Sequence, residues 1–268
     1  MTAATATTPG ATATQAILRA EGIVKQFGGL TAVDSVDFEV PEQSIVSIIG
    51  PNGAGKTTFF NCMTGLYKPS AGKVTFAGKD ITGKPPHLVT QAGIARTFQN
   101  IKLFKTMTVL ENVQVGRHAR MKARITGSVF RTPFVRREEK AVEEHSRELL
   151  RLVGLPRRHH DLAANLPYGD QRRLEIARAL ASDPQLLLLD EPTAGMNPQE
   201  SAELTDLMHK LRAERGIAVL LIEHDMKVVM GVSDHITVLA EGRKIAAGAP
   251  QEVRANPRVI EAYLGSQA

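Results

Sequence analysis

The stretch Gly50-Pro51-Asn52-Gly53-Ala54-Gly55-Lys56-Thr57-Thr58 decides the fold of this chain. It fully matches the phosphate-loop pattern, in which two glycines separated by four residues precede a lysine and a serine or threonine. Residues 45–49 before it are rich in β-branched side chains and predict a buried strand. Residues 59–63 after it predict a helix that ends at Gly65. Strand, glycine loop and helix in this order indicate a phosphate site rather than an incidental glycine-rich turn.

The residue types of this loop suit the binding of a nucleotide's phosphates. Glycines allow the backbone to curl until successive N–H groups point at one anion, and the following helix adds the positive end of its dipole. Lys56 supplies a point charge for the outer phosphates. The Thr57 hydroxyl is a hard oxygen ligand of the kind that Mg²⁺ accepts. We therefore expect residues 50–58 to bind a nucleotide together with Mg²⁺.

Composition and charge are those of an ordinary soluble globular protein. The 268 residues are 43% hydrophobic and 23% charged, which suffices for one large domain or two small ones. With no tryptophan and 4% aromatic residues, aromatic platforms for stacking bases are not expected. The net charge of +5 fits a solvated basic surface, and also a nucleotide or an anionic membrane nearby. Cys62 is the only cysteine, and no apolar run approaches the roughly 18–20 residues that span a bilayer.

The amino-terminal part predicts a tail followed by antiparallel strands. Residues 1–16 are rich in alanine and threonine and carry no charged side chain, so we expect a disordered tail and not a secretory signal. Further on, Val36, Phe38 and Val40 alternate with acidic residues, which predicts a half-buried antiparallel strand. Phe27 precedes two glycines and offers a ring to a flat ligand, although a single phenylalanine is more often part of a core.

The middle of the chain predicts a helical subdomain, at about residues 101–182, inserted into a domain that covers residues 17–268. Apolar spacing indicates a helix at about residues 138–153. The basic segment 117–137 before it looks like a loop, whose charges are solvated or touch lipid headgroups.

The second half alternates helices with apolar strands. A helix over residues 168–181 leads to the continuous apolar run 185–189, which is typical of a parallel strand buried on both faces. A helix with apolar residues at positions 204, 207, 208 and 211 and a second buried strand, 217–222, follow. We therefore predict an α/β fold with a mainly parallel sheet and an amino-terminal antiparallel β subdomain.

Polar residues follow three of the apolar strands, where the strand ends of a parallel sheet form one crevice. Asp190 can hold Mg²⁺ through water beside Thr57, and Glu191 can polarise an attacking water. His224 can contact the terminal phosphate, and Gln99 offers an amide to the metal or the water. Each of these residues alone could also be a surface carboxylate, a capping residue or a satisfied histidine. Together with the phosphate loop they predict a hydrolytic site.

With these motifs, residues 17–268 resemble an ATP-binding-cassette (ABC) ATPase, a P-loop NTPase. The phosphate loop resembles the family's Walker A motif, Gln99 its Q-loop, residues 189–191 its Walker B motif with the catalytic glutamate, and His224 its switch histidine. The resemblance implies ATP hydrolysis with Mg²⁺ as cofactor and assigns Phe27 to stacking on the adenine. It also implies a head-to-tail pair of cassettes, in which the signature segment of one subunit covers ATP bound to the other.

The signature segment, residues 166–173, departs from the family's Leu-Ser-Gly-Gly-Gln pattern. Pro167 replaces the serine and lacks a backbone N–H, while Tyr168 and Asp170 replace a glycine and the glutamine. Gly169 keeps an N–H that can face a phosphate at the start of a helix. We assign Tyr168, Gly169 and Asp170 to the nucleotide site on this resemblance. Asn197 stands where the family's D-loop usually has aspartate.

With these departures, the sequence resembles one branch of the family, the larger ATPase subunit of branched-chain amino acid importers. The similarity lies in residues 166–178, 194–198, 222–226 and 256–265. It implies the following partners: a second ATPase subunit, which is a copy of this chain or a different one, two membrane permeases, and indirectly an external solute-binding protein. It also implies a peripheral place on the cytoplasmic face of the plasma membrane, and no nucleic-acid partner.

Other functions within this class remain open. The chain could power a transporter for another solute, such as urea or other amino acids, or for lipopolysaccharide. A soluble ABC ATPase that acts on ribosomes or DNA is less consistent with one set of motifs and no sustained heptads. If a permease is the partner, part of the apolar segment after Gln99 is expected to form a groove for a permease helix, unless these residues are core. The residues concerned are Ile101, Leu103, Phe104 and Val109.

Overall fold

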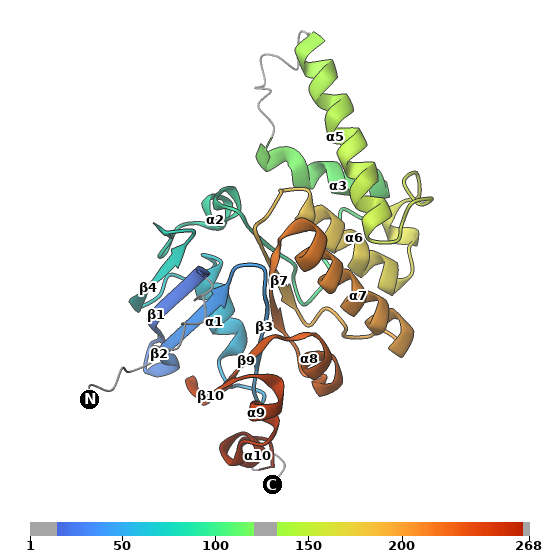
Figure 1. The fold of residues 1–268 in the computed structure, drawn as a ribbon. Coiled ribbons are helices and arrows are strands. Elements are labelled where there is room, and N and C mark those ends of the chain that lie inside the picture. Colours follow the sequence, from blue (N-terminus) through green and yellow to red (C-terminus); the bar gives the residue numbers. More distant parts are fainter. Residues whose placement is uncertain (1–14, 121–132, 265–268) are drawn as a thin grey trace, which may run out of the picture.

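The computed structural model describes residues 15–120 and 133–264, and its elements follow the predicted order of strands and helices (Figure 1). The strands are β1 (Ala16–Phe27), β2 (Leu30–Pro41), β3 (Ile45–Ile49), β4 (Ala71–Phe76), β5 (Lys79–Asp80), β6 (Ile94–Arg96), β7 (Leu186–Asp190), β8 (Ala218–Ile222), β9 (His235–Ala240) and β10 (Arg243–Gly248). The helices are α1 (Lys56–Met63), α2 (Pro86–Ala92), α3 (Val109–Arg117), α5 (Pro133–Leu152), α6 (Tyr168–Leu180), α7 (Pro198–Arg215), α8 (Met226–Val232), α9 (Pro250–Arg254) and α10 (Pro257–Leu264), with 3₁₀ turns η1 (His118–Arg120) and η2 (Ala163–Asn165).

Two sheets form among these described residues. In the larger sheet the order is β10-β9-β3-β8-β7-β6, and all neighbouring strands are parallel except β9 and β10. In the smaller sheet the order is β2-β1-β4-β5, and every pair is antiparallel. The predicted combination of a mainly parallel sheet with an amino-terminal antiparallel sheet is confirmed. Because β3, β8 and β7 are neighbours, their carboxyl ends lie side by side.

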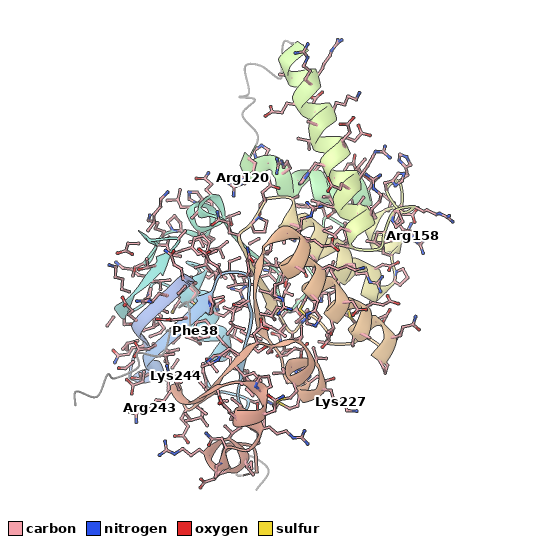
Figure 2. All side chains as sticks on the ribbon, viewed as in Figure 1. Phe38, Arg120, Arg158, Lys227, Arg243 and Lys244 are labelled. Atoms are coloured by element: carbon pink, nitrogen blue, oxygen red, sulfur yellow. The ribbon has the colours of Figure 1, made fainter. Side chains whose placement is uncertain are left out.

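The apolar strands of the parallel sheet are buried because they serve two cores. Leu186 and Leu188 of β7 face the core that α1 and the antiparallel sheet share. The intervening Leu187 and Leu189 face the core formed with α3, α5, α6 and α7. Helix α1 thus lies between the two sheets. Phe38 of β2, labelled in Figure 2, packs edge-on against Phe59 of α1, with ring centroids 5.6 Å apart. A continuous run of leucines is what this arrangement requires.

Helices α3, α5 and α6 pack together on one side of the parallel sheet, and α5 extends away from the body of the molecule (Figure 1). Helices α3 and α6 approach closely, since a Cβ added to Gly116 would lie 2.0 Å from the carbonyl oxygen of Arg178. The predicted helix over residues 138–153 is longer than expected, because α5 begins at Pro133. The early start buries Val135 and leaves the basic residues of this turn on the outer face.

Two predicted boundaries therefore change. The segment expected to be a loop, 117–137, is helical at both ends: Arg117 closes α3 and residues 133–137 belong to α5, while residues 121–132 lie outside the described part. Most of the predicted tail, residues 1–14, also lies outside the described part, and Ala16 already belongs to β1, where it pairs with Pro41.

Candidate functional site

The phosphate loop connects β3 to α1 and takes its shape from glycines. Gly55 caps α1 with φ +91°, a conformation that favours glycine, and a Cβ at this position would lie 2.4 Å from the carbonyl oxygen of Ala32. The Ala54 N–H donates to the Pro51 carbonyl over 3.2 Å, which closes the turn. No acidic residue stands in the first turn of α1, so the positive end of the helix dipole is free to attract an anion.

Lys56 is the first residue of α1, and its ammonium group points back into the loop. Nζ donates to the carbonyl oxygens of Gly50 over 2.7 Å and Pro51 over 2.9 Å. Burial lowers the pKa of Lys56, and the nearby carboxylates of Glu191 and Asp190 partly offset this effect. The structure therefore brings the lysine of the loop close to the two carboxylates at the end of β7. Among the other loop residues, Asn52, Gly53 and Thr57 are exposed and Thr58 is half-buried.

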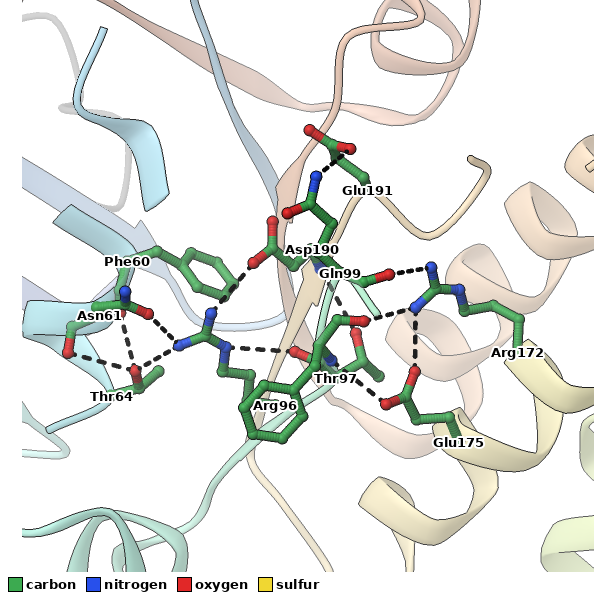
Figure 3. Close-up of polar contacts among 11 residues, drawn as sticks. Phe60, Asn61, Thr64, Arg96, Thr97, Gln99, Arg172, Glu175, Asp190 and Glu191 are labelled. Atoms are coloured by element: carbon green, nitrogen blue, oxygen red, sulfur yellow. Dashed lines mark hydrogen bonds and ion pairs between the residues drawn. The ribbon is translucent and has the colours of Figure 1, made fainter. Parts of the chain in front are cut away.

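Asp190 and Glu191 sit at the carboxyl end of β7 in very different environments (Figure 3). Asp190 is buried, and its Oδ2 lies 3.1 Å from Nη2 of Arg96. Burial raises the pKa of Asp190, while the Arg96 guanidinium opposes that rise. Glu191 has φ +46°, a left-handed conformation that is unfavourable for a residue with a Cβ. Its N–H donates to the Ile222 carbonyl over 2.8 Å, which helps to fix this conformation.

Gln99 and Glu191, which are far apart in the sequence, are in direct contact (Figure 3). Nε2 of Gln99 donates to Oε2 of Glu191 over 3.0 Å, and Gln99 is exposed. The amide thus reaches the carboxylate directly. The sequence pattern predicted that both side chains face one crevice, but it did not predict this contact.

His224 follows β8, and its side chain is 66% exposed, with Nδ1 3.6 Å from the carboxylate of the preceding Glu223. Glu223 itself is buried and was not predicted as a site residue. Its carboxylate accepts hydrogen bonds from the backbone N–H groups of Thr193 over 3.0 Å and His224 over 2.9 Å. It therefore joins the loop after Glu191 to the loop that carries His224. The position of Glu223 directly before His224 was the one signal in the sequence that could have indicated that Glu223 joins these loops.

Arg96 is a second residue that the sequence analysis missed. Its guanidinium contacts Asn61 Oδ1 over 2.6 Å and Thr64 Oγ1 over 3.0 Å, in addition to Asp190 (Figure 3). It also lies over the ring of Phe60, 4.7 Å from the ring centroid. Through these contacts Arg96 connects α1 with the buried carboxylate at the end of β7. A polar residue at the end of β6, the strand beside β7, is the signal that could have indicated it.

The predicted signature residues lie at the amino end of α6. Tyr168 is exposed and its ring lies 3.1 Å from where a Cβ of Gly195 would be. Gly169 is buried against the side chain of Glu200, where a Cβ would come within 2.5 Å of Oε1. Asp170 is half-buried, and its carboxylate lies 4.0 Å from Arg158. The segment is thus packed tightly against the loop that begins α7.

Phe27 ends β1 at the turn to β2, and its ring is partly exposed. It packs edge-on against Tyr67, with ring centroids 5.3 Å apart, and Lys25 Nζ lies 4.8 Å from the Phe27 centroid. The ring is therefore part of a small aromatic cluster and not an isolated core residue. Tyr67, on the segment after α1, was not predicted.

The donor set at this site suits Mg²⁺. The exposed Thr57 hydroxyl, the Asp190 carboxylate and the amide of Gln99 supply oxygen atoms, which are the ligands that Mg²⁺ prefers. Within the described residues no cluster of three or more His, Cys, Asp or Glu side chains could hold a metal ion.

The apolar segment after Gln99 divides between the core and the surface. Val109 is fully buried, and Leu103 packs against the same core. Phe104 is 45% exposed and lines a cavity of about 310 Å³ together with residues of α3 and α6, among them Val115 and Arg178. Arg178 lies over the Phe104 ring, 5.8 Å from its centroid. Of the residues expected in a groove, Phe104 is therefore available at the surface and Val109 is not.

A glycine loop between strand and helix, beside paired acidic and amide groups at the carboxyl ends of parallel strands, defines a P-loop ATPase. Comparison with known proteins gives the family: residues 33–194 match the profile described as ABC transporter. The chain belongs to the ABC transporter family. A second profile, described as branched-chain amino acid ATP-binding cassette transporter, matches residues 243–268.

Individual relatives agree with this assignment. The chain is 48% identical to the high-affinity branched-chain amino acid transport ATP-binding protein BraF of Pseudomonas aeruginosa, over 93% of this chain and 98% of BraF. It is similar to an ATP-binding cassette of an ABC transporter solved in its ADP conformation, with a TM-score of 0.82 and 37% identity over 94% of this chain and 100% of that one. A bacterial cassette solved as a dimer has a TM-score of 0.75 and 26% identity, covering 87% and 98%.

These similarities show an ATPase that binds ATP. ABC cassettes form dimers, and the dimeric bacterial cassette is one example. None of the helices within the described residues is both long enough and apolar enough to cross a bilayer.

Proposed function

We propose that this chain is the ATP-hydrolysing subunit of an importer for branched-chain amino acids. The observation that carries this proposal is the match of residues 243–268 to the branched-chain amino acid profile, because this region follows the ATPase motifs and includes α9 and α10. The region lies outside the match to the general ABC transporter profile, which ends at residue 194. The similarity to BraF over nearly the whole length of both chains supports the same conclusion.

We assign the chemical roles as follows. Lys56, the N–H groups of residues 50–58 and the dipole of α1 bind the phosphates of ATP. Thr57, Asp190 and Gln99 hold Mg²⁺, which neutralises charge on the transferring phosphate when it is bound. Glu191 accepts a proton from the attacking water, and the exposed His224 contacts the terminal phosphate. The hydrogen bond from Gln99 to Glu191 supports this assignment, because it orients the carboxylate at the crevice.

The nucleotide base and the second subunit complete the site. Phe27 stacks on the adenine, and the neighbouring Tyr67 supports the ring from its edge. The amino end of α6, with Tyr168, Gly169 and Asp170, faces ATP bound to a second cassette. That cassette is another copy of this chain or a related one.

The remaining partners are two membrane permeases and, indirectly, an external solute-binding protein. The chain then stands peripherally on the cytoplasmic face of the membrane. The cavity beside Phe104 is the surface that we assign to a permease helix, because the exposed ring and the neighbouring Val115 offer apolar contacts to such a helix.

The experiment is purification of the tagged chain from membranes, identification of the permeases that accompany it, and leucine uptake with and without the chain. Loss of leucine, isoleucine and valine uptake on deletion, restored by the wild-type chain but not by Lys56→Ala, is the expected result. If uptake of these three amino acids is unchanged and uptake of urea or another solute is lost, the proposed substrate is wrong, but the proposed role as the ATPase of a transporter stands. Co-purification with ribosomes and no permease would overturn the transport function.

A further inference from the structure

Arg172 of α6 is a buried arginine that holds the backbone beside Gln99 (Figure 3). Its side chain has 0% exposure. Nη1 donates to the carbonyl oxygen of Phe98 over 2.6 Å, and Nη2 donates to that of Gln99 itself over 2.7 Å. The planar fork of a guanidinium can serve two adjacent carbonyls in this way, whereas the single ammonium of a lysine cannot hold the same geometry.

Glu175, one turn further along α6, holds the N–H groups of the same segment. Its Oε1 accepts from the N–H of Phe98 over 3.4 Å and from the N–H of Lys102 over 3.3 Å. Its Oε2 lies 3.1 Å from Nη1 of Arg172, which completes a buried ion pair. Burial raises the pKa of Glu175, and Arg172 opposes that rise. The pair therefore supplies both donors and acceptors to a stretch of backbone that belongs to no helix or strand.

This arrangement is costly, which argues against an incidental role. Two buried charges lose their hydration, and a well-packed apolar pair of similar volume is often at least as stable. The Nε of Arg172 is buried and has no hydrogen-bond partner within the described residues, which adds to the cost. What the pair provides in return is a fixed link from α6 to the segment that carries Gln99.

We propose that Arg172, together with Glu175, is a positioning residue for ATP hydrolysis: it fixes the backbone of Gln99 so that the Gln99 amide meets Glu191. The inference rests on the proposed roles of Gln99 and Glu191. The chain of contacts is continuous, from α6 through Arg172 to the Gln99 carbonyl, and from the Gln99 amide to Glu191 over 3.0 Å.

The place of Arg172 in α6 also connects it to the subunit interface. The same helix begins with Tyr168 and Gly169, which we assign to the ATP of the opposite subunit, and Tyr168 Oη lies 3.3 Å from Nη2 of Arg172. The Arg172–Glu175 pair therefore links the residues at the subunit interface to Gln99 in the same chain's own ATP site.

The test is a double-mutant cycle on the ATPase rate. The paired variant Arg172→Met with Glu175→Leu replaces the ion pair by apolar side chains, which keeps the helix packed but removes the contacts to the Gln99 segment. We expect kcat to fall roughly 10- to 100-fold, as for misplacement of a catalytic group, while KM for ATP changes by less than about threefold. In the Gln99→Ala background the same pair of substitutions should change kcat by less than about threefold, because the loss acts through Gln99.

Two further variants keep the test decisive. Arg215→Met removes an arginine of α7 whose ion pair leads to Glu148 of α5 and not to the Gln99 segment, and kcat should stay within about twofold of wild type. Arg172→Lys keeps the charge and loses the fork. If thermal melting shows that the paired variant is unfolded, Arg172→Lys carries the cycle, with an intermediate loss of kcat.

The inference would be overturned if the paired variant lowered kcat by the same factor in the Gln99→Ala background as in wild type, since Arg172 would then act elsewhere. A Gln99→Ala variant with wild-type kcat would overturn it as well. If the wild-type chain hydrolyses ATP, neither of these two results contradicts the proposed function. Absence of hydrolysis by the wild-type chain, alone and with its permeases, would overturn the proposed function and this inference together.

Discussion

The phosphate loop and the segment 97–108 face the same site, but different kinds of contact hold them. The loop is held by its own backbone: Gly55 lies against Ala32, and the Gly242 N–H donates to the Ala54 carbonyl over 3.1 Å. Backbone hydrogen bonds hold the two ends of the segment, at Thr97 and at residues 104–108. In addition, buried side chains bind its N–H and C=O groups, those of Arg172 and Glu175 near Gln99 and that of Asn112 near Phe104.

This difference shows how one site can combine a rigid part with an adjustable one. Backbone packing against a neighbouring strand leaves one arrangement, because a Cβ at Gly55 would collide with the Ala32 carbonyl. The position of a segment held by side chains from α3 and α6 depends on where those helices lie. Substitutions in the two regions should therefore have different signatures.

Glu191→Gln should have the largest effect, because the loop binds the ATP on which Glu191 acts and the segment contacts Glu191 through Gln99. The change keeps the size and the contact with Gln99 but removes the base, so hydrolysis should fall about 10²–10⁴-fold. ATP binding should persist, since the loop is untouched, and an ATP-bound dimer should accumulate. Phosphate release and light scattering with ATP and Mg²⁺ measure the two effects. A rate within about threefold of wild type would contradict the role of Glu191.

Gly55→Ala should destabilise the fold by about 2–5 kcal/mol, combining left-handed strain with the collision against Ala32. Gly53→Ala is the matched control: its φ is +78°, but a Cβ there meets nothing within 4 Å. It should cost only about 1–2 kcal/mol, from strain alone. Chemical denaturation measures both values. Equal losses would show that backbone packing against β2 does not hold the loop.

Lys56→Ala should weaken ATP binding by about 10- to 100-fold, because a charge-assisted contact worth roughly 1.5–3 kcal/mol is lost. Stability should change little, since within the described residues the hydrogen bonds of the Lys56 ammonium go to carbonyls of the loop itself. Calorimetric titration with ATP and Mg²⁺ gives the affinity. Unchanged affinity would remove Lys56 from phosphate binding and would leave the loop a purely structural turn.

Asn112→Ala should have the smallest effect and tests the other region. Its buried amide accepts from the Phe104 N–H over 2.9 Å and donates to the Phe104 carbonyl over 3.0 Å, so its loss should cost about 1–3 kcal/mol. Gln114→Ala on the same helix serves as the control, because Gln114 makes no side-chain hydrogen bond within the described residues. If the two variants melt alike, side chains do not hold the segment as described.

The difference between the two regions also explains what the sequence could predict. The phosphate loop, the apolar strands and the convergence of Asp190, Glu191 and His224 follow from local pattern and from the geometry of parallel sheets. The contacts made by Arg96, Arg172 and Glu223 do not, because each joins residues that are distant in the sequence and no periodicity marks them. The start of α5 at Pro133 was missed because Arg136 and Arg137 continue the basic character of the residues before them, which resembles a loop.

The left-handed backbone of Glu191 has a consequence for how this protein can evolve. A residue with a Cβ at φ +46° costs about 1–2 kcal/mol, a cost that glycine would avoid. Selection for stability alone would therefore favour replacing Glu191, while selection for hydrolysis keeps it. If copies of this gene diverged toward a role that needs ATP binding without turnover, position 191 is where we expect the catalytic side chain to be lost first.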